Sequence, residues 1–86
     1  MVSQTQPRST DKSTVRQDIR RIKWFIRKYY VDDGDDVEYI RVKHLGNREY
    51  EAEAKIWPNP FVSLYLVFRL KVNEDGWIKV LEYEEY

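Results

Sequence analysis

The sequence has no cysteine, only one histidine, and only three glycines and three prolines in 86 residues. Without cysteine, the chain can form neither a disulfide framework nor a thiolate metal site, and it is compatible with a reducing compartment. We therefore expect a cytoplasmic protein. The one histidine, His44, would need carboxylates alone to complete a metal site, so we interpret it as a residue near the end of a strand. We predict no metal or other cofactor.

The sequence also lacks a long hydrophobic run. No apolar segment approaches the roughly 18 to 20 residues that a membrane span requires, and the N-terminus lacks the apolar stretch of a secretory signal. Hydrophobic residues nevertheless make up 42% of the chain and aromatic residues 15%, which is enough for a packed interior. We expect one small soluble domain with no membrane span, able to bury roughly 60% of the surface that its unfolded chain exposes.

Charge is distributed unevenly along the chain, although the net charge is zero. Residues 1–30 hold eight Lys and Arg against two Asp, a net charge of +6, and residues 31–86 carry a net charge of −6. Such asymmetry describes how a protein associates with partners and does not determine its fold. The N-terminal part should therefore attract anionic partners.

One helix is predicted near the N-terminus. Residues 1–12 are polar and charged without periodicity, which predicts a flexible tail before a single domain at residues 13–86. Ser13 or Thr14 is expected to cap a helix that ends at Tyr30, before a segment rich in aspartate. At about 100° per residue, the apolar residues of this helix share one arc. The arc consists of Val15, Ile19, Ile22, Phe25, Ile26, Tyr29 and Tyr30.

Trp24 falls opposite that arc, on the side of the helix that should face solvent. Its neighbours three and four positions away are all cations, namely Arg20, Arg21, Arg27 and Lys28. An exposed indole among four positive charges indicates a contact surface, because aromatic residues and arginine are enriched at interfaces. Our leading hypothesis is a small non-enzymatic interaction protein that presents this face to an acidic protein partner.

The same face of the helix has other interpretations. Nucleic-acid phosphate is an alternative ligand, although the acidic remainder of the domain would repel it. An anionic membrane surface is another ligand for the same charges. In a purely structural interpretation, Trp24 packs against the N-terminal tail or a sheet edge, and the cations form a solvated face.

After Gly34 the apolar period changes from 3.6 to 2, which is typical of a helix followed by strands. Four strands are predicted: Val37–Leu45, Arg48–Trp57, Phe61–Val72 and Trp77–Glu84. A two-residue hairpin turn at Gly46 and Asn47 joins the first two strands. The prolines at 58 and 60 break the ladder because they cannot donate a backbone hydrogen bond, and residues 73–76 form the last turn.

These elements predict an α+β domain, in which one N-terminal amphipathic helix packs on a four-stranded antiparallel meander. The side of the sheet that faces the helix is predicted to carry Tyr50, Ala52, Ala54, Ile56, Val62, Leu64, Leu66, Phe68 and Leu70. Phe61, Tyr65 and Val67 then lie on the opposite face, which one helix cannot cover. An uncovered apolar surface predicts a homodimer formed through these three residues about a two-fold axis.

The order of elements resembles the cystatin-like and nuclear-transport-factor-like α+β domains, in which a curved antiparallel sheet wraps a long helix. The ending VFRLKVNEDGWIKVLEYEEY is similar to the last two strands of the latter group, with Asp75-Gly76-Trp77 in the hairpin. The resemblance covers roughly residues 22–86 and implies a fold. The glutamine-valine-glycine hairpin of cystatin inhibitors is absent, and so are the additional helices of the transport-factor-like group. A small-molecule binder or enzyme with a pocket between helix and sheet is a second alternative, with one helix to close the pocket.

Two further groups of residues carry side chains that could take part in chemistry. The carboxylates at positions 32, 33, 35, 36 and 38 do not have the ligand spacing of an EF-hand, so we interpret them as a polar turn. Ser63 is the only serine outside the tail and the helix cap, and nothing in the sequence places it near His44 or an acid. We therefore predict that the protein is not an enzyme.

Overall fold

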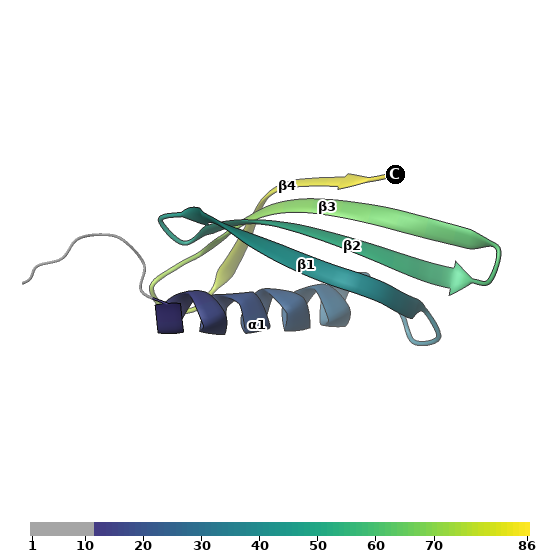
Figure 1. Cartoon of the computed structure of the whole chain (residues 1–86), viewed down its shortest axis with the longest axis horizontal. Coiled ribbons are helices and arrows are strands. Elements are labelled where there is room, and N and C mark those ends of the chain that lie inside the picture. Colours follow the sequence, from purple (N-terminus) through teal and green to yellow (C-terminus); the bar gives the residue numbers. More distant parts are fainter. Residues whose placement is uncertain (1–11) are drawn as a thin grey trace, which may run out of the picture.

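The structure, a computed structural model, describes residues 12–86, and the tail predicted before the domain lies outside the described residues except for Lys12. One helix is followed by four strands (Figure 1). The elements are α1 (Lys12–Tyr30), β1 (Asp36–Gly46), β2 (Glu49–Asn59), β3 (Val62–Val72) and β4 (Ile78–Glu85). The strands form one antiparallel sheet in the order β1-β2-β3-β4, which confirms the predicted α+β meander.

Helix α1 begins earlier than predicted, because Lys12 already belongs to it. Ser13 and Thr14 therefore lie within the first turn and not before it, and the predicted capping position is wrong. Polar residues are tolerated there, since the first four N–H groups of a helix have no partner within the helix. The helix ends at Tyr30 as predicted.

The β1–β2 turn lies one residue later in the chain than predicted, since the sequence predicted Gly46 and Asn47 as its central residues. Asn47 and Arg48 are its two central residues, and both have positive φ angles, of 51° and 59°. Positive φ at both positions is the geometry of a type I′ turn, whose twist matches that of the flanking strands. Gly46 instead pairs with Glu49 at the end of the ladder, after an irregularity that follows His44. Arg48 is thus a turn residue and not the first residue of a strand.

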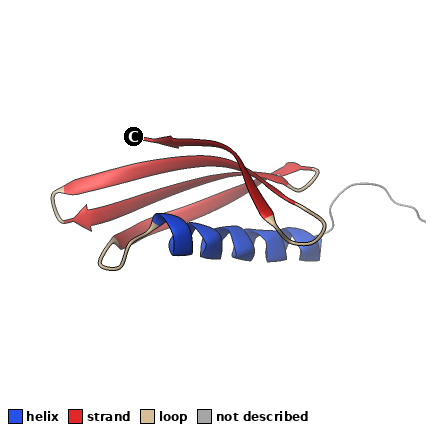
Figure 2. Cartoon of the chain, turned by 180° about the vertical axis from the view of Figure 1, so that it is seen from behind, coloured by secondary structure: helices blue, strands red, loops and turns tan. Residues whose placement is uncertain are grey.

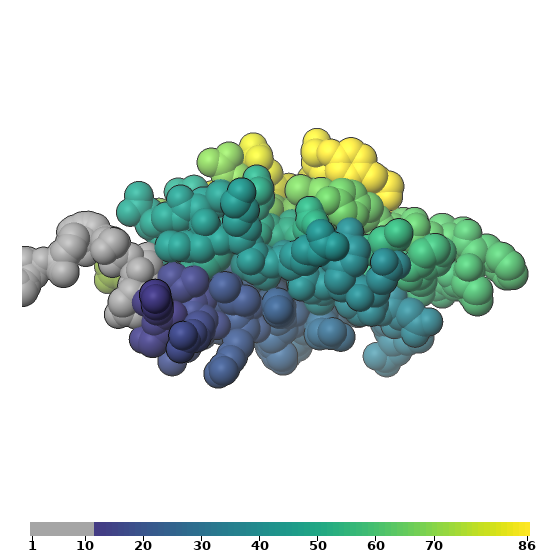
Figure 3. All heavy atoms as spheres, in the orientation of Figure 1, coloured from purple at the N-terminus to yellow at the C-terminus, as the bar shows by residue number. Residues whose placement is uncertain are grey.

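The two central strands, β2 and β3, supply most of the core. Tyr50, Ala52, Ala54 and Ile56 are buried as predicted, and the two small alanines leave room for the helix. The other buried hydrophobic residues are Ile22, Ile26, Leu66, Phe68, Leu70 and Val72. In the space-filling view, side chains of α1 and of the sheet meet along the boundary between the two layers (Figure 3). The interior of the helix–sheet interface is therefore filled.

The N-terminal end of β3, next to the β2–β3 turn, is more exposed than predicted. Val62 is 49% exposed and Leu64 is only partly buried, while Val72 at the other end of the strand is buried. A strand of 11 residues is about 36 Å long and a helix of 19 residues about 28 Å. The β2–β3 turn consequently extends beyond the end of α1, and no helix lies over it (Figure 1).

The outer face of the sheet, opposite α1, is more polar than predicted. Phe61 is 91% exposed and belongs to the β2–β3 turn, and the Tyr65 hydroxyl donates to Glu53 Oε2 at 2.7 Å. Val67 lies between two glutamates, with Glu53 and Glu84 as its cross-strand partners. The apolar surface expected from Phe61, Tyr65 and Val67 is thus interrupted by charges. Self-association through these residues stays a prediction.

Candidate functional site

Helix α1 carries one carboxylate, Asp18, and its side chain is fully buried. Arg48 donates to both of its oxygens, from Nη2 to Oδ1 at 2.7 Å and from Nε to Oδ2 at 3.1 Å. The Tyr50 hydroxyl donates to Oδ2 at 2.6 Å. A buried charge is tolerated only when it is paired and hydrogen-bonded, and Asp18 meets both conditions within this chain.

The cluster of Asp18, Arg48 and Tyr50 has a clear electrostatic character. The hydrogen bond to Asp18 raises the pKa of the Arg48 guanidinium, and burial together with the same carboxylate raises the pKa of Tyr50 well above its ordinary value. The His44 ring lies 5.1 Å from the Tyr50 ring, and its Nε2 atom is buried with no hydrogen-bond partner in the described part of the chain. The cluster connects the helix to the β1–β2 turn and leaves no charge of its own for a ligand.

Because Asp18 is buried, all the charged side chains on the exposed side of α1 are positive. Seven Lys and Arg side chains lie along it, and within residues 12–86 none of them forms an ion pair. These residues are Lys12, Arg16, Arg20, Arg21, Lys23, Arg27 and Lys28. The four cations predicted around Trp24 belong to this set. The helix therefore presents positive charge that no acidic side chain of residues 12–86 pairs with.

Trp24 lies on this cationic side with 57% of its surface exposed. The Lys28 Nζ atom is 4.7 Å from the centre of the indole, a distance at which a cation is attracted to the ring face. Tyr29 packs edge-on against Trp24 at 6.4 Å between ring centres and is itself 62% exposed. The placement of Tyr29 in the buried arc was therefore wrong, because near the end of the helix this side chain turns toward Trp24 and solvent.

A groove with a volume of about 640 Å³ runs beside Trp24, between α1 and the β3–β4 turn. We call it the Trp24 groove. It is lined by Arg21, Trp24, Phe25, Tyr29, Tyr30, Gly76, Trp77 and Ile78. Trp77 is 72% exposed, so the groove holds two indoles that are more than half accessible.

The groove exists because α1 is not centred on the sheet. The helix lies closest to β1, at one edge, and the sheet continues past it to β4 at the other edge. Seen from behind, the β3–β4 turn lies beside the helix (Figure 2). Gly76 in this turn has a φ of 88°, and a Cβ atom added there would lie 2.9 Å from Arg21 Nη1. Glycine thus allows the Arg21 guanidinium to rest on the turn at the rim of the groove.

Of the residues predicted for docking, Trp24 and Arg21 line the groove and Lys28 lies over the indole. Arg20 and Arg27 are exposed on the same helix but do not line the groove. Trp77 was not predicted as a site residue. The sequence shows Trp77 as an aromatic residue directly after an Asp-Gly turn. This pattern alone does not predict that the turn lies beside the helix.

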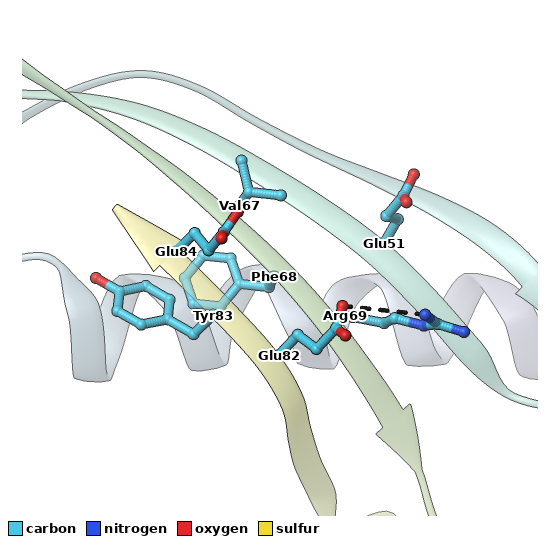
Figure 4. Close-up of a pocket in the computed structure, with 7 residues that line it drawn as sticks. All are labelled: Glu51, Val67, Phe68, Arg69, Glu82, Tyr83 and Glu84. Carbon is cyan, nitrogen blue, oxygen red and sulfur yellow. Dashed lines mark ion pairs between the residues drawn. The ribbon is translucent and has the colours of Figure 1, made fainter. Parts of the chain in front are cut away.

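A second hollow, of about 390 Å³, lies on the sheet over β2, β3 and β4 (Figure 4). Glu51 and Glu82 are the cross-strand partners of Arg69, and Glu84 lies beside Val67. Arg69 Nη1 is 3.9 Å from Glu82 Oε1. Residues 12–86 contain no group of three or more side chains placed to hold a metal ion. The acidic hollow is partly neutralised by its own arginine and differs in charge from the Trp24 groove.

No protein-family model matches the sequence, and comparisons with curated proteins and with solved structures found no match. The resemblance to cystatin-like and nuclear-transport-factor-like domains therefore stays a prediction. Within the described residues, no helix is both long and apolar enough to span a membrane.

Proposed function

We propose that this protein is a non-enzymatic interaction module whose Trp24 groove binds an acidic segment of a protein partner. The observation that carries this proposal is the coincidence of two exposed indoles, Trp24 and Trp77, in one groove with a cationic rim. Aromatic side chains in a groove supply apolar contact area, and the charges on the rim set the sign of the partner.

The structure supports a partner with both apolar and acidic side chains. An apolar or aromatic anchor of the partner would pack between Trp24 and Trp77, where each indole leaves more than half of its surface free. Carboxylates on either side of that anchor would face Arg21 and Lys28, which form no ion pair with other residues of the part described. Such a segment would gain both hydrophobic burial and charge-assisted hydrogen bonds.

The proposal is tested with a synthetic peptide of eight residues that has one central phenylalanine flanked by glutamates. We expect the peptide to quench or shift the tryptophan fluorescence of the protein in a saturable way. A matched peptide with glutamine in place of every glutamate should bind more weakly, by about 2- to 30-fold, because two exposed charge pairs of about 0.2 to 1 kcal/mol each are lost and 1.4 kcal/mol is about tenfold. Equal binding of both peptides would contradict the proposal.

Variants of the protein supply the second control. Arg21→Glu reverses the charge on the rim of the groove and should weaken the acidic peptide more than the glutamine peptide. Arg41→Glu makes the same change on the sheet, where Arg41 pairs with Glu53, and should leave peptide binding unchanged. If the two variants have the same effect, binding reflects net charge and not the groove.

Nucleic acid is a second candidate ligand, favoured by the seven cations along α1 that lie on one helix without an exposed carboxylate. Contact with about four phosphates of duplex DNA would give a slope near −3.6 in a plot of log affinity against log salt concentration. Fluorescence anisotropy of a labelled duplex at several salt concentrations measures this slope. A flat plot excludes this candidate, and a steep plot that is unchanged in Arg21→Glu excludes the groove as the binding site.

A further inference from the structure

Exposed hydrophobic side chains concentrate along one edge of the molecule. Nine large hydrophobic residues are exposed in the described part of the chain, and six of them lie on β4, on either side of it, or in the Trp24 groove. The six are Trp24, Tyr29, Trp77, Leu81, Tyr83 and Tyr86. Strand β4 is an edge strand of the sheet. An edge strand presents unpaired N–H and C=O groups, so this edge has both apolar surface and free backbone.

The second half of β4 directs alternate backbone groups outward. Tyr65 and Tyr86 exchange two backbone hydrogen bonds, from Tyr65 N to Tyr86 O at 3.2 Å and from Tyr86 N to Tyr65 O at 2.8 Å. In an antiparallel ladder such pairs alternate with pairs that exchange none. Glu84 therefore also faces β3 through its backbone, and Tyr83 and Glu85 direct their N–H and C=O groups to the free edge.

In the first half of β4, alternate residues also direct their backbone groups to the free edge. Val72 N donates to Arg48 O at 2.9 Å, on the β2 side, so the backbone groups of Val72 point away from β4. Its cross-strand partner Ile78 consequently exchanges no bonds with it and faces the free edge. Val80 is two residues further along and also faces outward. Four outward positions, two on each side of the irregularity at Leu81, are thus available to another strand.

We propose that a second copy of this chain pairs its β4 antiparallel to this edge, about a two-fold axis between Leu81 and Glu82. In that register Val80 lies opposite Tyr83 of the second copy, and Ile78 lies opposite Glu85 of the second copy. All four residues direct their backbone groups outward, as the ladder requires. All four also lie on the side of the sheet that faces α1, because their partners on β3 are the buried residues Leu66, Phe68, Leu70 and Val72.

The charged residues on the outer face of β4 also favour this register. Lys79 and Glu84 lie on the outer face of the sheet, since their partners on β3 are Lys71 and Val67. The two-fold axis places Lys79 opposite Glu84 of the second copy, and it does so twice in the dimer. Opposite charges directly across a ladder stabilise the pairing, and like charges destabilise it. A two-fold pairing also closes the assembly, which removes the exposed edge and does not lead to a fibre.

The pairing brings an acidic aromatic segment to the Trp24 groove, so the inference rests on and deepens the proposed function. Glu85 of the second copy arrives opposite Ile78, which lines the groove next to Arg21. Tyr83 of the second copy lies on the same side of the sheet, opposite Val80. The occupant that we assign to the groove is therefore the C-terminal end of β4 from a second copy, whose Tyr83 and Glu85 side chains face the α1 side of the sheet.

The test is the self-association of the full chain, measured by sedimentation velocity over a concentration series. We expect a reversible monomer–dimer equilibrium in the wild type. Lys79→Glu and Glu84→Lys should each weaken the dimer by about tenfold or more, because each change creates two like-charge pairs. The double variant Lys79→Glu with Glu84→Lys restores opposite charges across the axis and should recover most of the lost affinity. Both side chains are exposed, so the fold is preserved.

A second variant tests the backbone directly. Glu85→Pro removes an N–H that faces the free edge and not β3, so it should weaken the dimer without unfolding the strand. A monomer at every concentration, or a dimer whose affinity is not restored in the double charge variant, overturns the pairing. If the acidic peptide still binds the monomer in that case, the proposed function stands without the pairing. A restored dimer that Arg21→Glu does not affect leaves the pairing in place but overturns the C-terminal segment as the occupant of the groove.

Discussion

Asp18 and Trp24 both break the amphipathic pattern of the same helix, in opposite directions. Asp18 is a carboxylate on the apolar arc, and it is buried with three hydrogen bonds from residues of this chain. Trp24 is an indole on the cationic side, and it is 57% exposed beside an open groove. The first residue has its partners within the described chain. The second has free surface that a partner could cover.

This difference separates a structural exception from a functional one. A buried charge without partners would cost several kcal/mol, so its neighbours must be supplied by the fold itself. An exposed indole costs the folded state little, and its apolar surface contributes to stability only when something packs on it. The comparison therefore assigns Asp18 to folding and Trp24 to binding. Each assignment can be tested by a substitution with a matched control.

The largest loss of unfolding free energy is expected for Arg48→Met. This change leaves the Asp18 carboxylate buried with a single donor, Tyr50, and the loss of one partner of a buried ion pair costs about 3 to 5 kcal/mol of unfolding free energy. Urea denaturation measures it. The matched control is Arg41→Met, which breaks the exposed pair with Glu53 and should cost no more than about 1 kcal/mol. Similar losses in both variants would show that the Asp18 pair has no special role.

The Tyr50 hydroxyl makes the stability depend on alkaline pH. Because the pKa of Tyr50 is raised in the folded state, the folded protein keeps this proton at pH values where the unfolded chain, with a pKa near 10, releases it. This contribution is fully present below about pH 10 and is lost as the pH rises above that value, by about 1.4 kcal/mol per pH unit.

Tyr50→Phe isolates this dependence from that of the other tyrosines. The variant should lose about 1.5 to 3 kcal/mol at pH 7, because one hydrogen bond to a charged group is removed. Above pH 10 its unfolding free energy should fall less steeply than that of the wild type. Parallel curves in that range would mean that Tyr50 does not retain its proton in the folded protein.

A smaller loss of stability is expected for a substitution at the rim of the groove, and this substitution also tests peptide binding. Gly76→Ala and Gly34→Ala both place a side chain at positive φ, which costs about 1 to 2 kcal/mol. Only at Gly76 does the new Cβ atom also meet the Arg21 guanidinium, whereas nothing lies within 4 Å at Gly34. We therefore expect Gly76→Ala to weaken acidic peptide binding and Gly34→Ala to leave it unchanged. Equal binding by the two variants would mean that binding does not depend on the position of the Arg21 guanidinium on the turn.

The smallest effect on stability is expected for Trp24→Ala. Exposed positions away from the core usually change the unfolding free energy by no more than about 0.5 kcal/mol, whereas Ile22→Ala in the core should cost about 2 to 5 kcal/mol. Urea denaturation of the two variants compares them directly. A loss of several kcal/mol in Trp24→Ala would mean that the indole is a structural residue after all.

The sequence was sufficient for the elements and the inner face of the sheet, but not for how the helix is placed across the strands. The alternation of Tyr50, Ala52, Ala54 and Ile56 predicted their burial, because period-two patterning fixes one face of a strand. The exposure of Val62 could not be predicted in the same way, since it depends on where α1 ends above the sheet. Periodicity is a local property of the sequence, whereas the position of the helix on the sheet depends on tertiary packing.

The same distinction applies to the candidate site. The cations around Trp24 follow from helical spacing and were predicted, but the approach of Trp77 depends on a turn more than 40 residues later in the chain. The sequence carries one signal of the Asp18 cluster, a carboxylate three residues after Val15 and four before Ile22, within the apolar arc. Its partners Arg48 and Tyr50 come from the β1–β2 turn and the start of β2, so tertiary structure was required to identify them.

The three tryptophans allow one direct test of the central claim that the Trp24 groove binds an acidic segment. Each indole gives one N–H signal in a ¹H–¹⁵N spectrum. Trp57 lies outside the groove, with its Nε1 donating to Glu38 Oε1 at 2.8 Å, and serves as an internal control. On titration with the acidic peptide, the signals of Trp24 and Trp77 should shift together and saturate while that of Trp57 stays in place. Unmoved signals for Trp24 and Trp77, or an equal shift of Trp57, would contradict the claim.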